Sequence, residues 1–79
     1  MISSDLFSYL STLCDAYGVK MFYDFDMESC VHKFLFEKYM FVTTFKIDAE
    51  RLYEMGENGK YFLESKVQEA AELLQGCKY

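Results

Sequence analysis

Residues 19–47 form a continuous stretch rich in aromatic and other apolar side chains, and it contains no glycine, proline or asparagine. Within residues 19–28, apolar side chains alternate with polar ones, which is the two-residue period of a strand with one buried face. Phe22 is the exception, because it is the one apolar residue on the polar face. The apolar face of this expected strand consists of Val19, Met21, Tyr23, Phe25 and Met27.

Two further strands are expected, over residues 31–36 and 40–47, with a reversal at residues 37–39. One bent strand over residues 31–47 is the alternative, but strands longer than about ten residues are uncommon. In the third strand, we expect Phe41, Phe45 and Ile47 to face the helices. Val42, and Leu35 or Met40, are expected on the other face with Phe22. The register of the second strand stays open, because it carries apolar residues on both faces.

Helical patterns flank this stretch. Ser3, Ser4 and Asp5 can cap a helix over residues 4–17, and Gly18 follows where a left-handed residue commonly ends a helix. The apolar residues of this helix recur at helical spacing: Leu6, Leu10, Leu13 and Tyr17.

At the other end, Asp48 can cap a short helix over residues 49–55. The loop at residues 56–59 separates it from a longer helix that starts near Lys60 and stops at Gly76. The apolar stripe of the longer helix is Leu63, Val67, Ala70 and Leu74. The sequence therefore predicts one α+β domain over residues 1–79, with the helices packed on one face of a three-stranded antiparallel meander.

This order of elements resembles that of the double-stranded RNA binding domain, which also runs helix, three strands, helix. Such domains place several lysines at the start of the last helix to contact phosphates. The corresponding positions here are Glu57, Asn58, Lys60 and Glu64. The resemblance therefore covers the order of elements and does not imply RNA binding.

The charge of the chain argues in the same direction. Thirteen acidic residues against eight basic ones give a formal net charge of −5. An acidic domain lacks the basic surface that neutralises nucleic-acid phosphates or anionic lipids, so direct binding to nucleic acid or to a membrane is not expected. The chain has no apolar run near the length of a membrane span and no secretory leader pattern. Its three cysteines fit reduced thiols, and we expect a cytoplasmic protein.

Catalytic or metal chemistry would have to involve Cys30 and His32, which lie two residues apart. Zinc requires about four ligands, and Cys14 and Cys77 offer no paired spacing to complete a site. A Cys–His nucleophilic pair would also need an orienting carboxylate and an oxyanion pocket. The favoured interpretation is a half-buried Cys30 and a surface His32, with Cys14 in the core. We expect no catalytic residue, no metal and no cofactor, and a Cys/His enzyme is the least favoured class.

Three carboxylates, Asp24, Asp26 and Glu28, are expected on one face of the first strand, roughly 6–7 Å apart. One hypothesis is a metal site, and a second is that this row imitates nucleic-acid phosphates. The protein would then inhibit a nucleic-acid-binding protein, in the manner of inhibitors made by phages and mobile elements. The simpler interpretation is a solvated sheet face whose charge prevents edge-to-edge pairing.

The excess of aromatic residues carries the leading hypothesis. The core is expected to contain Phe7, Tyr23, Phe25, Phe41, Phe45 and Phe62. The residues left over are Phe22, Tyr9, Tyr39, Met40, Tyr53 and Tyr61. Tyr and Met are frequent at interface centres. We therefore predict a non-catalytic interaction module that binds a partner protein or forms a homodimer, through a face comprising Phe22, Leu35, Tyr39, Met40 and Val42.

Overall fold

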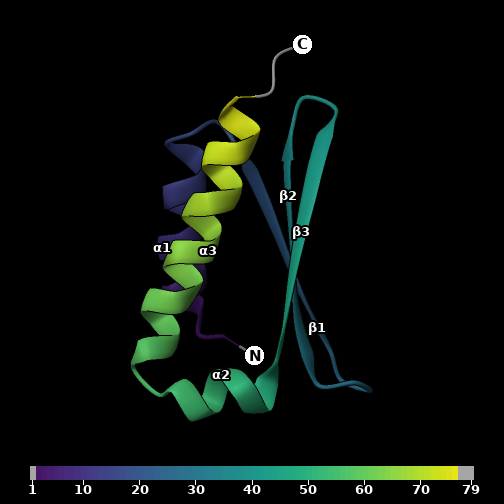
Figure 1. Cartoon of the computed structure of the whole chain (residues 1–79), viewed down its shortest axis with the longest axis vertical. Coiled ribbons are helices and arrows are strands. Elements are labelled where there is room, and N and C mark those ends of the chain that lie inside the picture. Colours follow the sequence, from purple (N-terminus) through teal and green to yellow (C-terminus); the bar gives the residue numbers. More distant parts are fainter. Residues whose placement is uncertain (1, 77–79) are drawn as a thin grey trace.

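The computed structural model describes residues 2–76 and has the predicted α+β architecture. A single helix precedes the sheet, three antiparallel strands follow in the order β1-β2-β3, and a helix pair ends the described chain. The elements are α1 (Ser4–Asp15), β1 (Lys20–Asp26), β2 (Val31–Lys38), β3 (Phe41–Asp48), α2 (Ala49–Met55) and α3 (Asn58–Gln75). Helices α1 and α3 lie along one face of the sheet, and α2 lies across the end of this layer (Figure 1).

Local chemistry explains the ends of α1. Ser3 is the N-cap residue, and its Oγ accepts a hydrogen bond from the backbone N–H of Leu6 at 3.1 Å. At the other end, Gly18 has a φ of +71°, so it adopts the left-handed conformation that the sequence predicts. The chain then enters β1 at Lys20, with Val19 already buried.

The register of β2, which the sequence left open, is fixed by the core. His32, Phe34 and Phe36 are buried against the helices, whereas Leu35 points to the opposite face. Phe22 lies opposite Leu35, and Leu35 lies opposite Thr44. Because side chains alternate along a strand, burial of the even-numbered residues turns all the odd-numbered ones of β2 away from the helices.

The core lies between the sheet and the two longer helices. The Phe34 ring is at its centre, with centroids 5.0 Å from Tyr23, 6.1 Å from Phe45 and 6.4 Å from Phe36. Helix α3 buries Ala71 completely, whereas the predicted Ala70 is half-buried. The other buried apolar residues from the helices are Leu10, Cys14, Leu63, Val67 and Leu74.

Three predictions about the ends of strands are wrong. The expected core residue Phe41 is 41 % exposed, because it begins β3 next to the hairpin turn. Met27, expected on the buried face, lies beyond the end of β1 in the loop and is 82 % exposed. The second reversal occupies Tyr39 and Met40 rather than residues 37–39, since Lys38 pairs with Phe41.

The hairpin turn between β2 and β3 has an unusual residue at its first central position. Tyr39 has a φ of +57°, whereas Met40 keeps a negative φ. These signs are those of a type II′ turn, which normally has glycine where Tyr39 stands. A bulky residue at positive φ costs roughly 1–2 kcal/mol, so this turn is strained.

We predict that Tyr39→Gly has a free energy of unfolding about 1 kcal/mol higher than that of Tyr39→Ala, because glycine removes the cost of positive φ. Both variants lose the tyrosine ring, so the comparison isolates the backbone. Urea unfolding followed by circular dichroism measures the difference. Equal stabilities, or a more stable alanine variant, would show that the turn is not strained.

Candidate functional site

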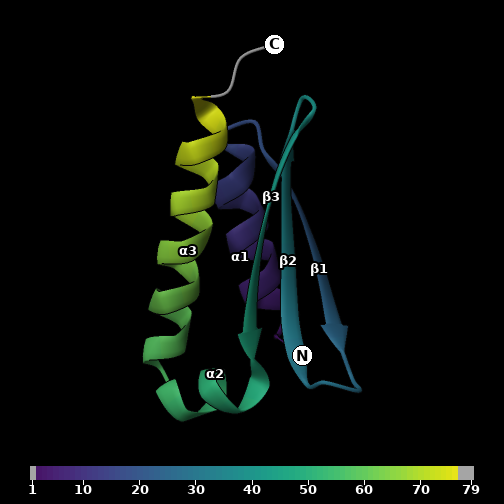
Figure 2. The same ribbon diagram turned by 45° about the vertical axis from the view of Figure 1, so that its right-hand side comes forward.

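The sheet has one face without a helical cover, which we call the outer face. It consists of the strand residues that alternate with the buried ones, and none of the described helices lies on this side (Figure 2). The residues of the outer face are Lys20, Phe22, Asp24, Asp26, Val31, Lys33, Leu35, Glu37, Val42, Thr44, Lys46 and Asp48.

An apolar row crosses the middle of the outer face. Phe22, Leu35 and Thr44 are direct cross-strand neighbours, one from each strand. The Phe22 side chain is 52 % exposed, although it is a large apolar group. A shallow depression of about 300 Å³ lies between this row and the neighbouring residues Asp24, Lys33 and Lys46. The predicted neighbours Phe22 and Leu35 are therefore brought together by the register of the sheet.

Charged rows lie on both sides of the apolar row. Towards the hairpin turn, Lys20 is opposite Glu37, and Glu37 is opposite Val42. We call this set the tip-side row. On the other side, Asp24 is opposite Lys33, and Lys33 is opposite Lys46, which we call the loop-side row. In the tip-side row the positive charge is on β1 and the negative charge is on β2. In the loop-side row these positions are reversed, with Asp24 on β1 and Lys33 on β2.

The predicted face is only partly continuous. Val42 lies on the outer face in the tip-side row and is 53 % exposed. Tyr39 and Met40 are exposed at the hairpin turn itself, beyond the tip-side row. The Lys38 Nζ lies 5.8 Å from the centroid of the Tyr39 ring. The turn residues therefore extend the edge of the outer face rather than its centre.

The predicted acidic residues do not form one negative strip. Glu28 lies in the loop after β1, not on the strand. Asp26 Oδ1 accepts hydrogen bonds from the backbone N–H groups of Glu28 (3.0 Å) and Ser29 (3.4 Å). Asp26 Oδ2 lies 3.3 Å from Lys33 Nζ. Hydrogen bonding from Ser29, and then from Lys33, lowers the pKa of the Asp26 carboxyl below its ordinary value. Asp26 thus holds the loop through hydrogen bonds, and of the three predicted acidic residues only Asp24 is exposed on the strand.

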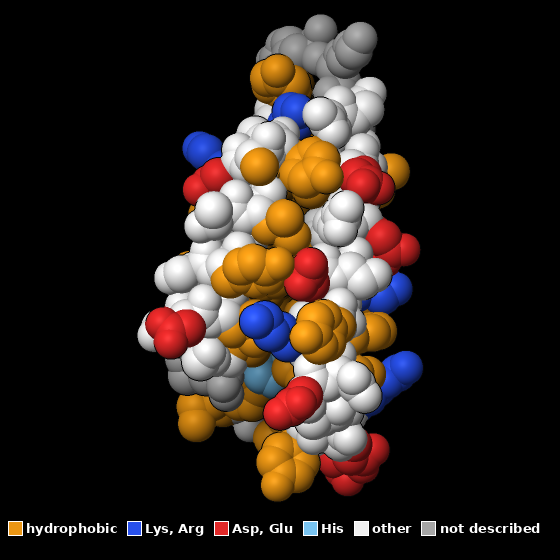
Figure 3. Space-filling model, turned by 90° about the vertical axis from the view of Figure 1, so that its left-hand side faces the viewer, with side chains coloured by type: hydrophobic (Ala, Val, Ile, Leu, Met, Phe, Trp, Pro, Cys, Tyr) orange, Lys and Arg blue, Asp and Glu red, His pale blue; other side chains and the backbone are white. Residues whose placement is uncertain are grey.

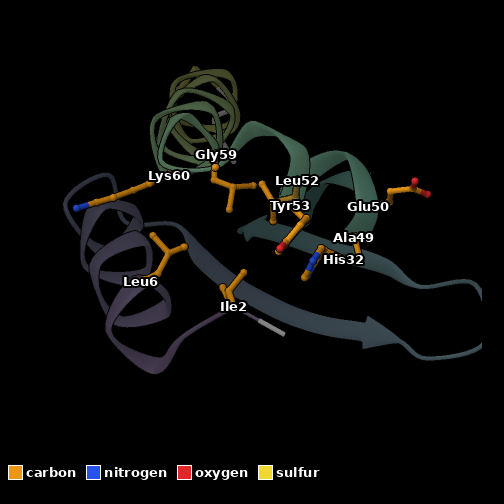
Figure 4. Close-up of a pocket in the computed structure, with 11 residues that line it drawn as sticks. Ile2, Leu6, His32, Ala49, Glu50, Leu52, Tyr53, Gly59 and Lys60 are labelled. Carbon is orange, nitrogen blue, oxygen red and sulfur yellow. The ribbon is translucent and has the colours of Figure 1, made fainter.

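A groove on the opposite side of the molecule is the second candidate site. It has a volume of about 590 Å³ and opens among α1, α2 and the start of α3. Ile2, Leu6 and Leu52 are among its apolar lining residues, and the His32 ring points into it (Figure 4). The histidine is visible at the bottom of the hollow in the space-filling view (Figure 3). The prediction of a surface His32 is wrong, because this residue is 5 % exposed on the helix-facing side of β2.

Hydrogen bonds assign a proton position to His32. The Ile2 N–H donates to Tyr23 Oη at 3.2 Å, and Tyr23 Oη lies 2.7 Å from His32 Nδ1. With its oxygen accepting from Ile2, Tyr23 can donate its own proton to Nδ1, which leaves the imidazole proton on Nε2. Burial lowers the pKa of His32 below its ordinary value of 6.5, so the ring is neutral at pH 7.

Cys30 and His32 do not form a nucleophilic pair. Cys30 is exposed rather than half-buried, because it ends the β1–β2 loop with a φ of +55°. Its Sγ lies 3.7 Å from the Met27 carbonyl oxygen, whereas His32 bonds to Tyr23. The cavity at Cys30 shares Glu50 with the groove, but Cys30 does not line the groove and His32 does not line the cavity. Cys14 lies in the core as predicted, and burial raises the pKa of its thiol to about 11. Cys77 lies outside the described residues.

Within residues 2–76, no group of three or more His, Cys, Asp or Glu side chains is close enough to hold a metal ion. None of the helices in this part of the chain is long and apolar enough to cross a membrane. Sequence reasoning missed the burial of His32 and its pairing with Tyr23. Both follow from the burial of the even-numbered residues of β2. The sequence did not show which face of this strand is buried, because β2 carries apolar residues on both faces.

Comparisons with protein-family models, with curated proteins and with solved structures find no match for this chain. The candidate sites are therefore interpreted from their own geometry.

We predict that the protein loses stability as the pH falls below 6.5. The folded-state pKa of His32 is lowered, so the unfolded chain binds a proton more readily and acidification favours unfolding. His32 is the one histidine in the sequence, so few other side chains titrate in this range. Urea midpoints measured between about pH 7.5 and about pH 5 test this. His32→Gln should flatten the pH dependence in that window, and an unchanged slope would contradict the prediction.

Proposed function

We propose that this protein is a small interaction module without catalytic activity, which binds another protein chain through the outer face. The observation that carries the proposal is the uncovered apolar row of Phe22, Leu35 and Thr44 at the centre of that face. Every described helix packs on the opposite side, so nothing within the described chain shields this row from water.

The energetics of the face support this role. Complete burial of a fully exposed Phe or Leu side chain contributes roughly 1.5–3 kcal/mol. Phe22 is 52 % exposed and Leu35 is half-buried, so covering both contributes about as much as one such side chain. Their neighbours are charged, with Lys20 and Glu37 on one side and Asp24 and Lys33 on the other. An apolar centre with a charged rim is the usual anatomy of a protein interface, in which the rim supplies specificity.

The geometry gives less support to the other functions. Inhibition by phosphate mimicry requires a continuous negative surface, yet the outer face carries three lysines among four carboxylates. The same mixture offers no concentrated positive charge for direct nucleic-acid binding. Catalysis by Cys30 and His32 is disfavoured by their separate surroundings. A reducing compartment such as the cytoplasm fits this proposal, because Cys14 and Cys30 are free thiols.

A photo-crosslinking amino acid placed at Phe22 in cells tests the proposal. We expect discrete crosslinked products from this position, and none from the same group placed at Glu69, which is exposed on α3. Mass spectrometry of the products shows whether the occupant is another protein or a second copy of the chain. Absence of any product from Phe22, or equal products from both positions, would reject the outer face as an interface.

A second test uses Phe22→Ser combined with Leu35→Ser, which removes the apolar row without changing charge. Binding of whichever occupant the crosslink identifies should weaken by at least about tenfold, because two buried apolar side chains are lost. Unfolding by urea provides the control for folding, since both side chains lie on the surface opposite the core. Unchanged binding by the folded double variant would show that this row is not the centre of the interface.

A further inference from the structure

We propose that the occupant of the outer face is a second copy of this chain. The two copies would be related by a two-fold axis that runs across the strands, along the row of Phe22, Leu35 and Thr44. This inference rests on the proposed function, since it names the partner of the same face. It is carried by the order of charges on the two rows that flank the apolar row.

Two sheets can meet face to face about a two-fold axis that lies in the plane between them. If that axis runs across the strands, each strand lies over its own copy with its direction reversed. The tip-side row of one copy then faces the loop-side row of the other. Lys20 faces the partner's Asp24, and Glu37 faces the partner's Lys33. By symmetry both pairs occur twice, so each acid and base named here faces the opposite charge.

The other simple alignment, with the axis along the strands, places each row over itself. The central strand β2 then lies over β2 of the other copy, and each of its residues faces the same residue of that copy. Glu37 would face Glu37 of the partner subunit, and Lys33 would face Lys33 of the partner subunit. Like charges facing each other in an interface disfavour association. This alignment would also bring Asp24 opposite the partner's Lys46, which is favourable, but it keeps the two like-charge contacts at its centre. With the axis across the strands no like charges of these rows face each other, and Lys46 faces the partner's Val42. The charge pattern therefore favours the axis across the strands.

The dimensions of packed sheets are compatible with these pairs. Same-face residues two positions apart lie roughly 7 Å apart along a strand, and packed sheets are about 10 Å apart, a gap that facing Lys and Asp or Glu side chains together can span. Aligned sheets usually cross at about 30°, which moves a row that is about 7 Å from the axis by roughly 3.5 Å. This shift is smaller than the spacing between strands, so the facing partners are retained.

At the axis itself, Phe22 and Leu35 pack against the same residues of the second copy. The depression between the apolar row and the loop-side row gives the side chains of the second copy space beside Phe22 and Leu35. Three strands and four rows give a plan area of only about 400 Å² per copy, against about 800 Å² in a standard stable interface. We therefore expect a dimer that depends on protein concentration and weakens with salt.

Charge exchange tests this geometry. The tip-side variant combines Lys20→Glu with Glu37→Lys, and the loop-side variant combines Asp24→Lys with Lys33→Asp. Each exchange keeps the net charge and the opposite signs of the cross-strand pair, although Lys33→Asp also removes the ion pair of Lys33 with Asp26. Each variant alone should dimerise at least about tenfold more weakly than the wild type, because like charges then face each other. An equimolar mixture of the two should recover dimerisation, because opposite charges face each other again.

The matched control combines Lys66→Glu with Glu69→Lys on α3. These residues form an i,i+3 ion pair with Lys66 Nζ 3.3 Å from Glu69 Oε2, on the helical side of the molecule. This exchange should leave dimerisation unchanged. Sedimentation equilibrium from about 10 µM to about 1 mM, at low and high salt, covers the range expected for a small interface. Recovery in the mixture also shows that both variants fold, since an unfolded chain could not provide its row.

The outcomes separate this inference from the proposed function. A wild-type chain that is monomeric at all these concentrations overturns the second copy as occupant. Dimerisation that is unaffected by the exchanges, or that is not recovered in the mixture, overturns the axis across the strands. A crosslink from Phe22 to a different protein, with a monomeric chain, rejects this inference while the proposed function stands. A crosslink to the chain itself, with recovery in the mixture, supports both.

Discussion

Packing of the two central phenylalanines against the helical layer is the constraint on which the rest of the structure depends. Phe34 and Phe36 are buried in β2 beneath α1 and α3. Because a strand alternates its side chains, this choice also buries His32 and turns Leu35 outward. Both candidate sites result from this alternation in β2. The even-numbered residues face the helices and place His32 in the groove, and the odd-numbered residues place Leu35 in the apolar row of the outer face.

A chain of this length has enough helix to cover one side of its sheet. Two-layer domains of this kind leave the second face to water or to a partner. Here that face combines exposed Phe22 and Val42 with mixed charges. A uniformly polar outer face would point to a self-contained monomer. The mixture instead gives the face an apolar centre and an ordered set of charges, and the proposed interface rests on this combination.

The loops show how local backbone geometry can oppose sequence preference. Both hairpin connections place a non-glycine residue at positive φ, Cys30 in one and Tyr39 in the other. Neither connection contains the Asn-Gly or Asp-Gly pair that usually marks a tight hairpin. Tertiary packing of the strands and helices holds these turns in place. For that reason the sequence could indicate that reversals exist, but it misplaced the second one.

The sequence by itself determined the order of elements, the antiparallel meander and the helical cover of one sheet face. These depend on short-range periods: alternation in β1, helical spacing in α1 and α3, and glycines after helices, as at Gly18. It also identified Phe22 and Val42 as outward-facing, since their strands have a single clear apolar face. Only the tertiary structure decided the register of β2, the burial of His32 beside Tyr23, the exposure of Phe41, and the order of charges across the rows. These depend on which residues of different strands lie opposite one another, and a strand that is apolar on both faces holds no local information about that choice.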